Sequence, residues 1–121
     1  GECETAPKEL HFLSAPLREA MHEAREAALW LLSIGKTDPN GLGAGSYAYL
    51  KLIGVVAVGW MWLRLAAAAL PEVDDPFCAA KLATARHYAL HALPQAVALR
   101  RQVEAGPDVL MALPAEAFPR D

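Results

Sequence analysis

A run of twelve residues without a charged side chain lies in the middle of the chain, from Leu52 to Leu63, and Lys51 and Arg64 bracket it. A helix that is apolar on every side is usually buried. We therefore expect a second helix, from about Tyr47 to Leu70, to form the centre of the domain with other helices around it. At a rise of about 1.5 Å per residue the run is too short to cross a bilayer, so we expect no membrane span.

An amphipathic segment precedes this run and predicts the first helix. Ser14, Ala15 and Pro16 indicate its start, because proline is well tolerated in the first turn. Gly35 indicates its end, because glycine readily adopts the left-handed conformation that closes many helices. Its apolar stripe recurs at spacings of four and three and consists of Leu17, Met21, Ala24, Ala28 and Leu31.

A third helix is expected after Pro71, which stops the second. Asp75 followed by Pro76 is typical of an N-cap and a first helical residue, and Gly106–Pro107 indicates the end. Its stripe of mostly small residues favours close antiparallel packing and consists of Cys78, Leu82, Ala85, Ala89, Ala92, Ala96, Leu99 and Val103. Pro94 lies inside this stripe and predicts a kink, because proline removes one helix hydrogen bond.

Three long helices with short links predict an all-α fold, an antiparallel up-down-up bundle with short helical segments at its ends. We expect residues 1–13 to be a lead-in and residues 14–121 to be a single helical domain. A turn is expected at residues 38–41, and residues 109–118 are expected to pack back on the bundle. The chain starts with Gly1 rather than methionine, so we expect it to be a piece of a longer polypeptide.

Composition limits the partners that the chain can have. The net charge of −3 favours neither nucleic acid nor an anionic membrane surface, so we expect no nucleic-acid partner. Hydrophobic residues make up 55% of the chain, which suggests a very apolar helix or a surface that meets a partner. Cys3 and Cys78 lie far apart, which excludes a CxxC zinc site but leaves their redox state open.

Three motifs resemble functional sites but lack residues that such sites require. Residues 35–37 (Gly-Lys-Thr) lack the first glycine and the preceding strand of a phosphate-binding loop. Glu19 and His22 have the spacing of a di-iron motif, which needs a second copy and two further glutamates. His87 and His91 could chelate a metal but have no third ligand nearby. We therefore predict no catalytic, cofactor-binding or metal-binding residue; a metal-binding bundle that uses these three histidines is one alternative.

Aromatic side chains gather on or beside the second helix, where Trp60 and Trp62 point to different sides. The first interpretation is that these rings belong to the core. Both rings cannot easily face one small core, so a surface that meets a partner is the alternative. Arg64 should reach solvent or pair with a carboxylate, because a lone buried charge is too costly. The candidate interface residues are Tyr47, Trp60, Trp62, Arg64, Arg86, Tyr88 and Phe118.

Small residues on the second helix predict close helix packing. Gly54, Ala57 and Gly59 allow a neighbouring backbone to approach, at some cost in helix propensity. If this face meets a neighbouring helix, Gly54→Leu should destabilise the chain by about 1–3 kcal/mol through overpacking.

Three strings in order resemble a known family. They are GAGSYAYLKLIGVVAVGWMWLRLA (residues 43–66), AKLATARHYALHALP (residues 80–94) and LMALPAEAF (residues 110–118). Together they resemble the C-terminal domain of bacterial acyl-CoA dehydrogenases of the 3-methylmercaptopropionyl-CoA dehydrogenase type. The similarity covers nearly the whole chain from about Leu17 onward.

The resemblance implies a much longer parent flavoenzyme, of which this chain is the excised C-terminal domain. Such an enzyme binds FAD, removes the α-proton of an acyl-CoA with a glutamate and passes a hydride to the flavin; electron-transferring flavoprotein then accepts the electrons. None of the family's catalytic or flavin-binding residues corresponds to a position of this chain. The expected role is therefore non-catalytic, as a contact with the remainder of the dehydrogenase or within a homo-oligomer, in a bacterial cytoplasm. A free-standing helical interaction module is the main alternative.

Overall fold

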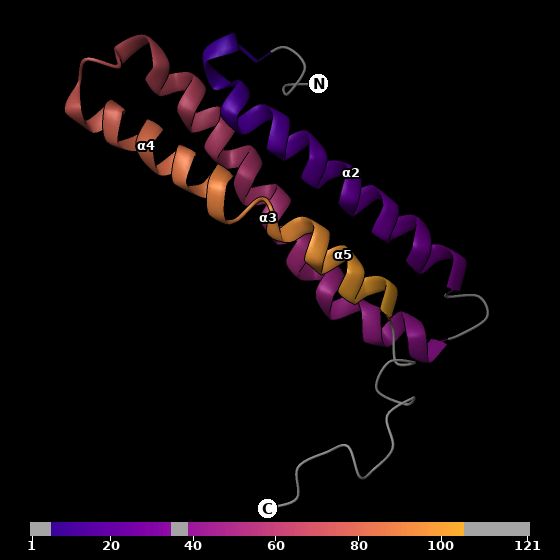
Figure 1. The fold of residues 1–121 in the computed structure, drawn as a ribbon. Helices are drawn as coiled ribbons and strands as arrows, with labels where there is room; N and C mark the ends of the chain where they lie inside the picture. The colour runs from indigo at the N-terminus through magenta and orange to yellow at the C-terminus, as the bar shows by residue number, and fades with distance from the viewer. Residues whose placement is uncertain (1–5, 35–38, 106–121) are drawn as a thin grey trace, which may run out of the picture.

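The computed structural model describes residues 6–34 and 39–105, nearly all of which are helical (Figure 1). In chain order the elements are η1 (Lys8–Leu10), α2 (His11–Ile34), α3 (Pro39–Ala69), η2 (Leu70–Glu72), α4 (Pro76–His91) and α5 (Gln95–Ala105). Helix α3 runs back along α2, and α4 and α5 together form the third rod. The predicted all-α, up-down-up bundle is therefore confirmed. The predictions for Gly35, Gly106–Pro107 and residues 109–118 lie outside the described residues.

The three rods contact one another along most of their length. Helix α2 packs against α3, α4 and α5, and α3 packs against both parts of the third rod. The end of α2 and the start of α3 lie at one end of the bundle, and η1 and η2 lie at the other (Figure 1). The core consequently runs along the axis that the three rods share.

Helix α2 faces this core with a regular heptad stripe. Its buried apolar residues, together with Leu10 of η1, are Leu10, Leu13, Leu17, Ala20, Ala24, Ala27 and Leu31. Leu17, Ala24 and Leu31 were predicted correctly. Met21 was not: it is exposed, and Ala20, one residue earlier, takes the core position. Ala28 is half-buried, beside the fully buried Ala27. The alternation of three and four residues keeps the stripe facing the partner helices.

Two helices begin earlier than the sequence predicts. Helix α2 starts at His11 rather than Ser14, which places Pro16 inside the helix. Leu10 and Leu13 are fully buried, and their burial offsets the hydrogen bond that the proline cannot make. Helix α3 starts at Pro39, so the turn predicted at 38–41 is wrong from residue 39 onward. Proline is favoured at the first helical position, where its missing N–H costs nothing.

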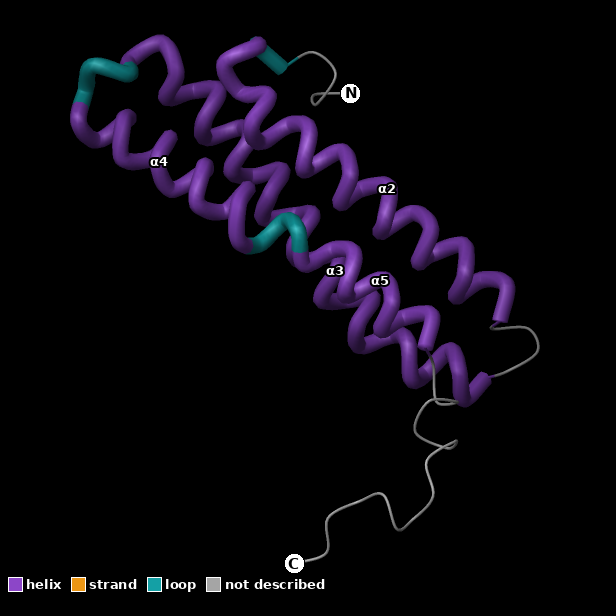
Figure 2. The backbone as a smooth tube through the Cα atoms, in the orientation of Figure 1, coloured by secondary structure: helices purple, strands orange, loops and turns teal. Residues whose placement is uncertain are grey.

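The third rod follows its sequence signals closely. The Asp75 side chain accepts a hydrogen bond from the Phe77 N–H at 3.1 Å, and Pro76 is the first residue of α4, as predicted. Every residue of the predicted stripe is buried or half-buried. The rod breaks at residues 92–94 (teal in Figure 2), where the Leu93 N–H reaches back to the Tyr88 carbonyl and Pro94 has no N–H to donate. The kink predicted at Pro94 is thus a full break between α4 and α5.

Helix α3 is not enclosed as the sequence predicts. One side packs into the bundle, with Leu52 and Leu63 buried, whereas much of the opposite side is exposed. The described residues provide two other rods, and these cover adjacent faces of α3 because they also contact each other. A three-rod bundle of this kind cannot surround one of its own members.

The glycines of α3 differ in what surrounds them. A Cβ at Gly45 would lie 3.0 Å from the Val103 carbonyl oxygen and 2.9 Å from Leu31 Cδ2, whereas a Cβ at Gly54 would meet nothing within 4 Å. Within residues 6–34 and 39–105 the predicted packing role of Gly54 is therefore wrong, and Gly54→Leu has no neighbour there to overpack. At Gly59 a Cβ would lie 3.0 Å from Leu17 Cδ1, so close approach is correct there.

We predict opposite effects of alanine at Gly45 and Gly54. Gly54→Ala should stabilise the chain by about 1 kcal/mol, or roughly 4 °C in Tm, because helix propensity rises without a clash. Gly45→Ala should lower Tm, because the Val103 backbone oxygen cannot move aside cheaply. Thermal unfolding followed by circular dichroism measures both, and a decrease in Tm for Gly54→Ala would contradict the exposed position of this residue.

Candidate functional site

The exposed side of α3 is an extended, mostly apolar surface of the described residues. We call it the outer face, and its members, all exposed, are Leu50, Lys51, Ile53, Gly54, Ala57, Val58, Met61, Arg64, Leu65 and Ala68. Leu50 is 67% exposed and Met61 55%. Contiguous exposed apolar surface on a soluble domain commonly marks a contact with another molecule.

Three of the predicted interface residues lie on or beside this face. Tyr47 is exposed and holds the Lys51 ammonium 4.7 Å from its ring centre. Trp60 is partly exposed and carries the Arg64 guanidinium 4.7 Å from its ring centre. Arg64 is exposed, in agreement with the prediction that it reaches solvent. These cation–π contacts hold both charges against aromatic rings one turn earlier on the same helix.

The other predicted interface residues lie elsewhere. Trp62 is half-buried and packs against the core. Tyr88 is half-buried, and its hydroxyl donates a hydrogen bond to the Val55 carbonyl at 2.6 Å, which ties α4 to α3; burial raises the pKa of this phenol. The Arg86 guanidinium lies over the Phe12 ring at 4.4 Å and connects α4 to α2. Phe118 lies outside the described residues.

Two grooves adjoin the break between α4 and α5. One, of about 360 Å³, runs between α2 and the third rod and is lined by Glu19, Glu23, Leu93 and Pro94 among others. The other, of about 630 Å³, runs between α3 and the third rod. Its lining includes Lys51, Gly54 and Val58 from α3 and Leu99 and Gln102 from α5. The outer face therefore continues into a groove on its α5 side.

The histidine motifs do not form a metal centre with other described residues. His87 and His91 are both exposed, with ring centres 4.3 Å apart, and no described group of three possible ligands includes them. Glu19 and His22 are exposed on α2. A metal-binding bundle therefore gains no support from these positions.

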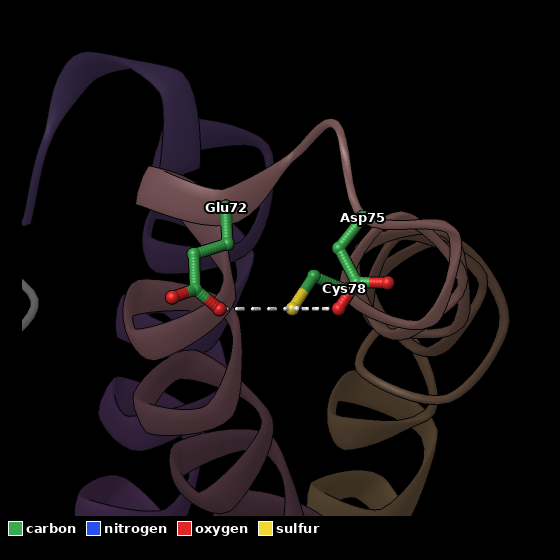
Figure 3. Close-up of side chains that lie close together, drawn as sticks. All are labelled: Glu72, Asp75 and Cys78. Atoms are coloured by element: carbon green, nitrogen blue, oxygen red, sulfur yellow. Dashed lines mark hydrogen bonds between the residues drawn. The ribbon is translucent and has the colours of Figure 1, made fainter.

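A cluster of three possible ligands lies at the start of α4 (Figure 3). The Cys78 sulfur is 3.8 Å from a Glu72 oxygen and 3.7 Å from an Asp75 oxygen, and the sulfur lies between the two carboxylates. The three ligand atoms lie within 4.8 Å of one another. Both carboxylates are exposed, and Asp75 already caps α4, so capping and a thiol hydrogen bond account for the arrangement.

The surroundings of Cys78 make it a poor nucleophile. Desolvation raises the pKa of this buried thiol, and the charge and hydrogen bond of Asp75 raise it further. The thiol therefore stays protonated around neutral pH, and only the thiolate attacks electrophiles or binds metals well. The sequence analysis did not predict this cluster, because the position of Glu72 relative to α4 depends on the path of η2.

The length and composition of one described segment, Gly45–Glu72, would allow it to cross a membrane. It has 28 residues, an 18-residue stretch of it has a mean hydropathy of 1.8, and 28% of that stretch is buried in the bundle. Core helices of soluble proteins pass the same test. Lys51 and Arg64 lie within the segment, and a charged side chain at the centre of a bilayer is costly. Length and composition alone are therefore weak evidence of a span.

Sequence reasoning missed most of the outer face. Leu50, Ile53, Val58, Met61 and Leu65 were not among the predicted interface residues. A helix that is apolar all round has no periodicity to indicate which side is buried. The buried side of α3 is determined only when the apolar stripes of the two neighbouring rods pack against it.

We predict that Asp75→Asn lowers the pH at which Cys78 reacts. Asparagine can still cap α4, but the carboxylate charge that raises the thiol pKa is removed, so the thiolate forms at lower pH. The measurement is the pH midpoint of iodoacetamide alkylation in a Cys3→Ser background. Asp74→Asn, a neighbouring exposed carboxylate outside the cluster, is the control and should leave the midpoint unchanged. Equal midpoints for the two variants would contradict this account.

Comparison with known protein families gives a match that covers nearly the whole chain. The model of the family described as "Acetyl-CoA dehydrogenase C-terminal like" matches residues 2–114. A search of the curated proteins found no match. The family match covers all of the described helices, including the outer face and the Glu72–Cys78 cluster. The chain therefore belongs to the acetyl-CoA dehydrogenase C-terminal-like family and is a C-terminal domain of acyl-CoA dehydrogenase-like proteins.

Proposed function

We propose that this chain is a non-catalytic domain of an FAD-dependent acyl-CoA dehydrogenase, an oxidoreductase that acts on the CH–CH group of acyl-CoA thioesters. In this proposal the domain is a structural contact with the remainder of the dehydrogenase and within a homo-oligomer. The exposed outer face of α3, in a chain of this family, carries the proposal. Its apolar side chains gain stability only when another surface covers them.

The described residues do not fit a flavin site of their own. The pyrophosphate of FAD is usually held by backbone N–H groups at a glycine-rich turn or a helix N-terminus. The groove beside α5 offers a single cation, Lys51, and its α3 lining comes from the interior of that helix, where the N–H groups are already bonded. We therefore place FAD, acyl-CoA and the docking of electron-transferring flavoprotein in the rest of the parent enzyme.

The finer identity is part of the proposal. The string at residues 43–66 lies in α3, and the string at residues 80–94 covers most of α4 and the break after it. Both strings resemble the 3-methylmercaptopropionyl-CoA dehydrogenase type. We propose an enzyme of that type in a bacterial cytoplasm, with a short acyl-CoA as its substrate class and a place in fatty-acid metabolism. Turnover of 3-methylmercaptopropionyl-CoA compared with straight-chain acyl-CoAs would separate this type from its relatives.

The parent polypeptide with and without residues 2–114 provides the test. We predict flavin absorbance and acyl-CoA-dependent dye reduction for the full polypeptide, and neither for the 121-residue chain alone. Deleting the domain should leave flavin in the enzyme but lower its oligomeric mass or its melting temperature, because an apolar contact is lost. Light scattering, absorbance and thermal unfolding measure these quantities. Flavin bound to the isolated chain, or a deletion that changes neither mass nor melting temperature, would contradict the proposal.

A further inference from the structure

The outer face of α3 has the spacing of a helix-packing surface. Its central residues, Leu50, Gly54, Ala57, Met61, Arg64 and Ala68, recur at intervals of four and three and are all exposed. This is the same alternation by which α2 faces the core of the bundle. A second helix placed along such a stripe meets a continuous row of side chains.

Gly54 is an independent sign that a backbone approaches this face. A glycine in the middle of a helix costs about 1 kcal/mol relative to alanine. Inside the bundle Gly45 and Gly59 have close neighbours that account for them, but a Cβ at Gly54 would meet nothing within 4 Å. The missing side chain of Gly54 therefore accommodates no described residue of this chain, whereas it would let an external helix come close.

The charges of the face determine which partner fits. Lys51 and Arg64 are its only charged residues, both are cations, and neither forms an ion pair with a described residue. A second copy of α3 would bring two more cations and no carboxylate to the contact, because α3 contains no aspartate or glutamate. Like charges therefore make a copy of α3 a less favourable partner than a helix that carries carboxylates.

A helix with carboxylates beside its apolar stripe suits this face. Lys51 and Arg64 are thirteen residues apart, so the matching carboxylates should lie roughly 20 Å apart along the partner. The groove on the α5 side, with Gln102 at its edge, leaves room for polar side chains of such a helix. Within a C-terminal domain, the rest of the same polypeptide is the partner with the highest effective concentration.

We infer that the outer face of α3 receives an apolar helix of the dehydrogenase body, whose carboxylates pair with Lys51 and Arg64. This inference rests on the proposed function. The small residues Gly54 and Ala57 allow the partner helix to approach closely. Lys51 and Arg64 determine the register of that helix and disfavour α3 of another copy.

Cysteine labelling at Ala57 measures coverage of the face directly. Ala57→Cys and the control Ala98→Cys, an exposed alanine on α5, are prepared in a Cys3→Ser background, in the isolated chain and in the full dehydrogenase. Labelling by a polar maleimide should be slower by about tenfold or more at position 57 in the full enzyme, and unchanged at position 98, as expected for a contact of at least about 1.4 kcal/mol. Intact-mass spectrometry gives both rates.

Charge reversal tests the carboxylates. Lys51→Glu with Arg64→Glu should restore fast labelling at position 57 in the full enzyme. The matched pair Arg25→Glu with Arg101→Glu, two exposed cations on α2 and α5, should leave it slow. Protection that survives the α3 charge reversal would overturn the inferred ion pairs.

The remaining outcomes separate this inference from the proposed function. Fast labelling at position 57 in an enzyme that holds flavin and turns over acyl-CoA overturns the inference and leaves the proposed function standing. A full polypeptide without flavin overturns the proposed function, whatever the labelling rates are. In the isolated chain, protection that grows with protein concentration indicates a second copy. Protection by phosphatidylcholine–phosphatidylglycerol vesicles indicates a lipid surface, and either result overturns the inferred helix.

Discussion

Small side chains bring the three rods of this bundle close together, and most other features follow from that contact. Three of the six buried apolar residues of α2 are alanine, Ala85, Ala89 and Ala96 are buried on the third rod, and Gly45 and Gly59 of α3 have close neighbours. Close helix packing buries a narrow strip on each rod. The core is therefore thin, and each rod keeps a wide surface outside it.

That geometry has a different consequence for each rod. The outward surfaces of α2 and α5 are rich in charged residues, and the Arg100 guanidinium joins them through a 3.0 Å ion pair with Glu23 and a second 3.0 Å pair with Glu104. Helix α3 has few polar residues to present outward, so its outer face is apolar apart from Lys51 and Arg64. The same contact that folds the domain thus leaves an apolar surface of α3 exposed among the described residues.

Features controlled by neighbouring residues could be predicted from the sequence, and features controlled by docking could not. The Asp75 cap and the Pro94 break were correct because each depends on the residue's own hydrogen-bonding groups. The stripe on α2 was wrong by one residue at Met21, because alanine and methionine both fit an apolar pattern and only the close partner helix favours the smaller one. The outer face was missed because the uncharged run has no period, and the Glu72–Cys78 cluster because it depends on the path between two helices. The Arg100–Glu23 pair joins residues far apart in the chain, which no local pattern indicates.

The central claim is that α3 has one buried and one exposed side in this chain, and hydroxyl-radical footprinting of its leucines tests that claim most directly. The four leucines share one intrinsic reactivity, so their rates report exposure alone. Leu50 is 67% exposed and Leu65 38%, whereas Leu52 is 0% and Leu63 3%. Fast oxidation of Leu50 and Leu65 with protection of Leu52 and Leu63 is the predicted result. Similar rates at all four leucines, or protection of Leu50, would contradict it.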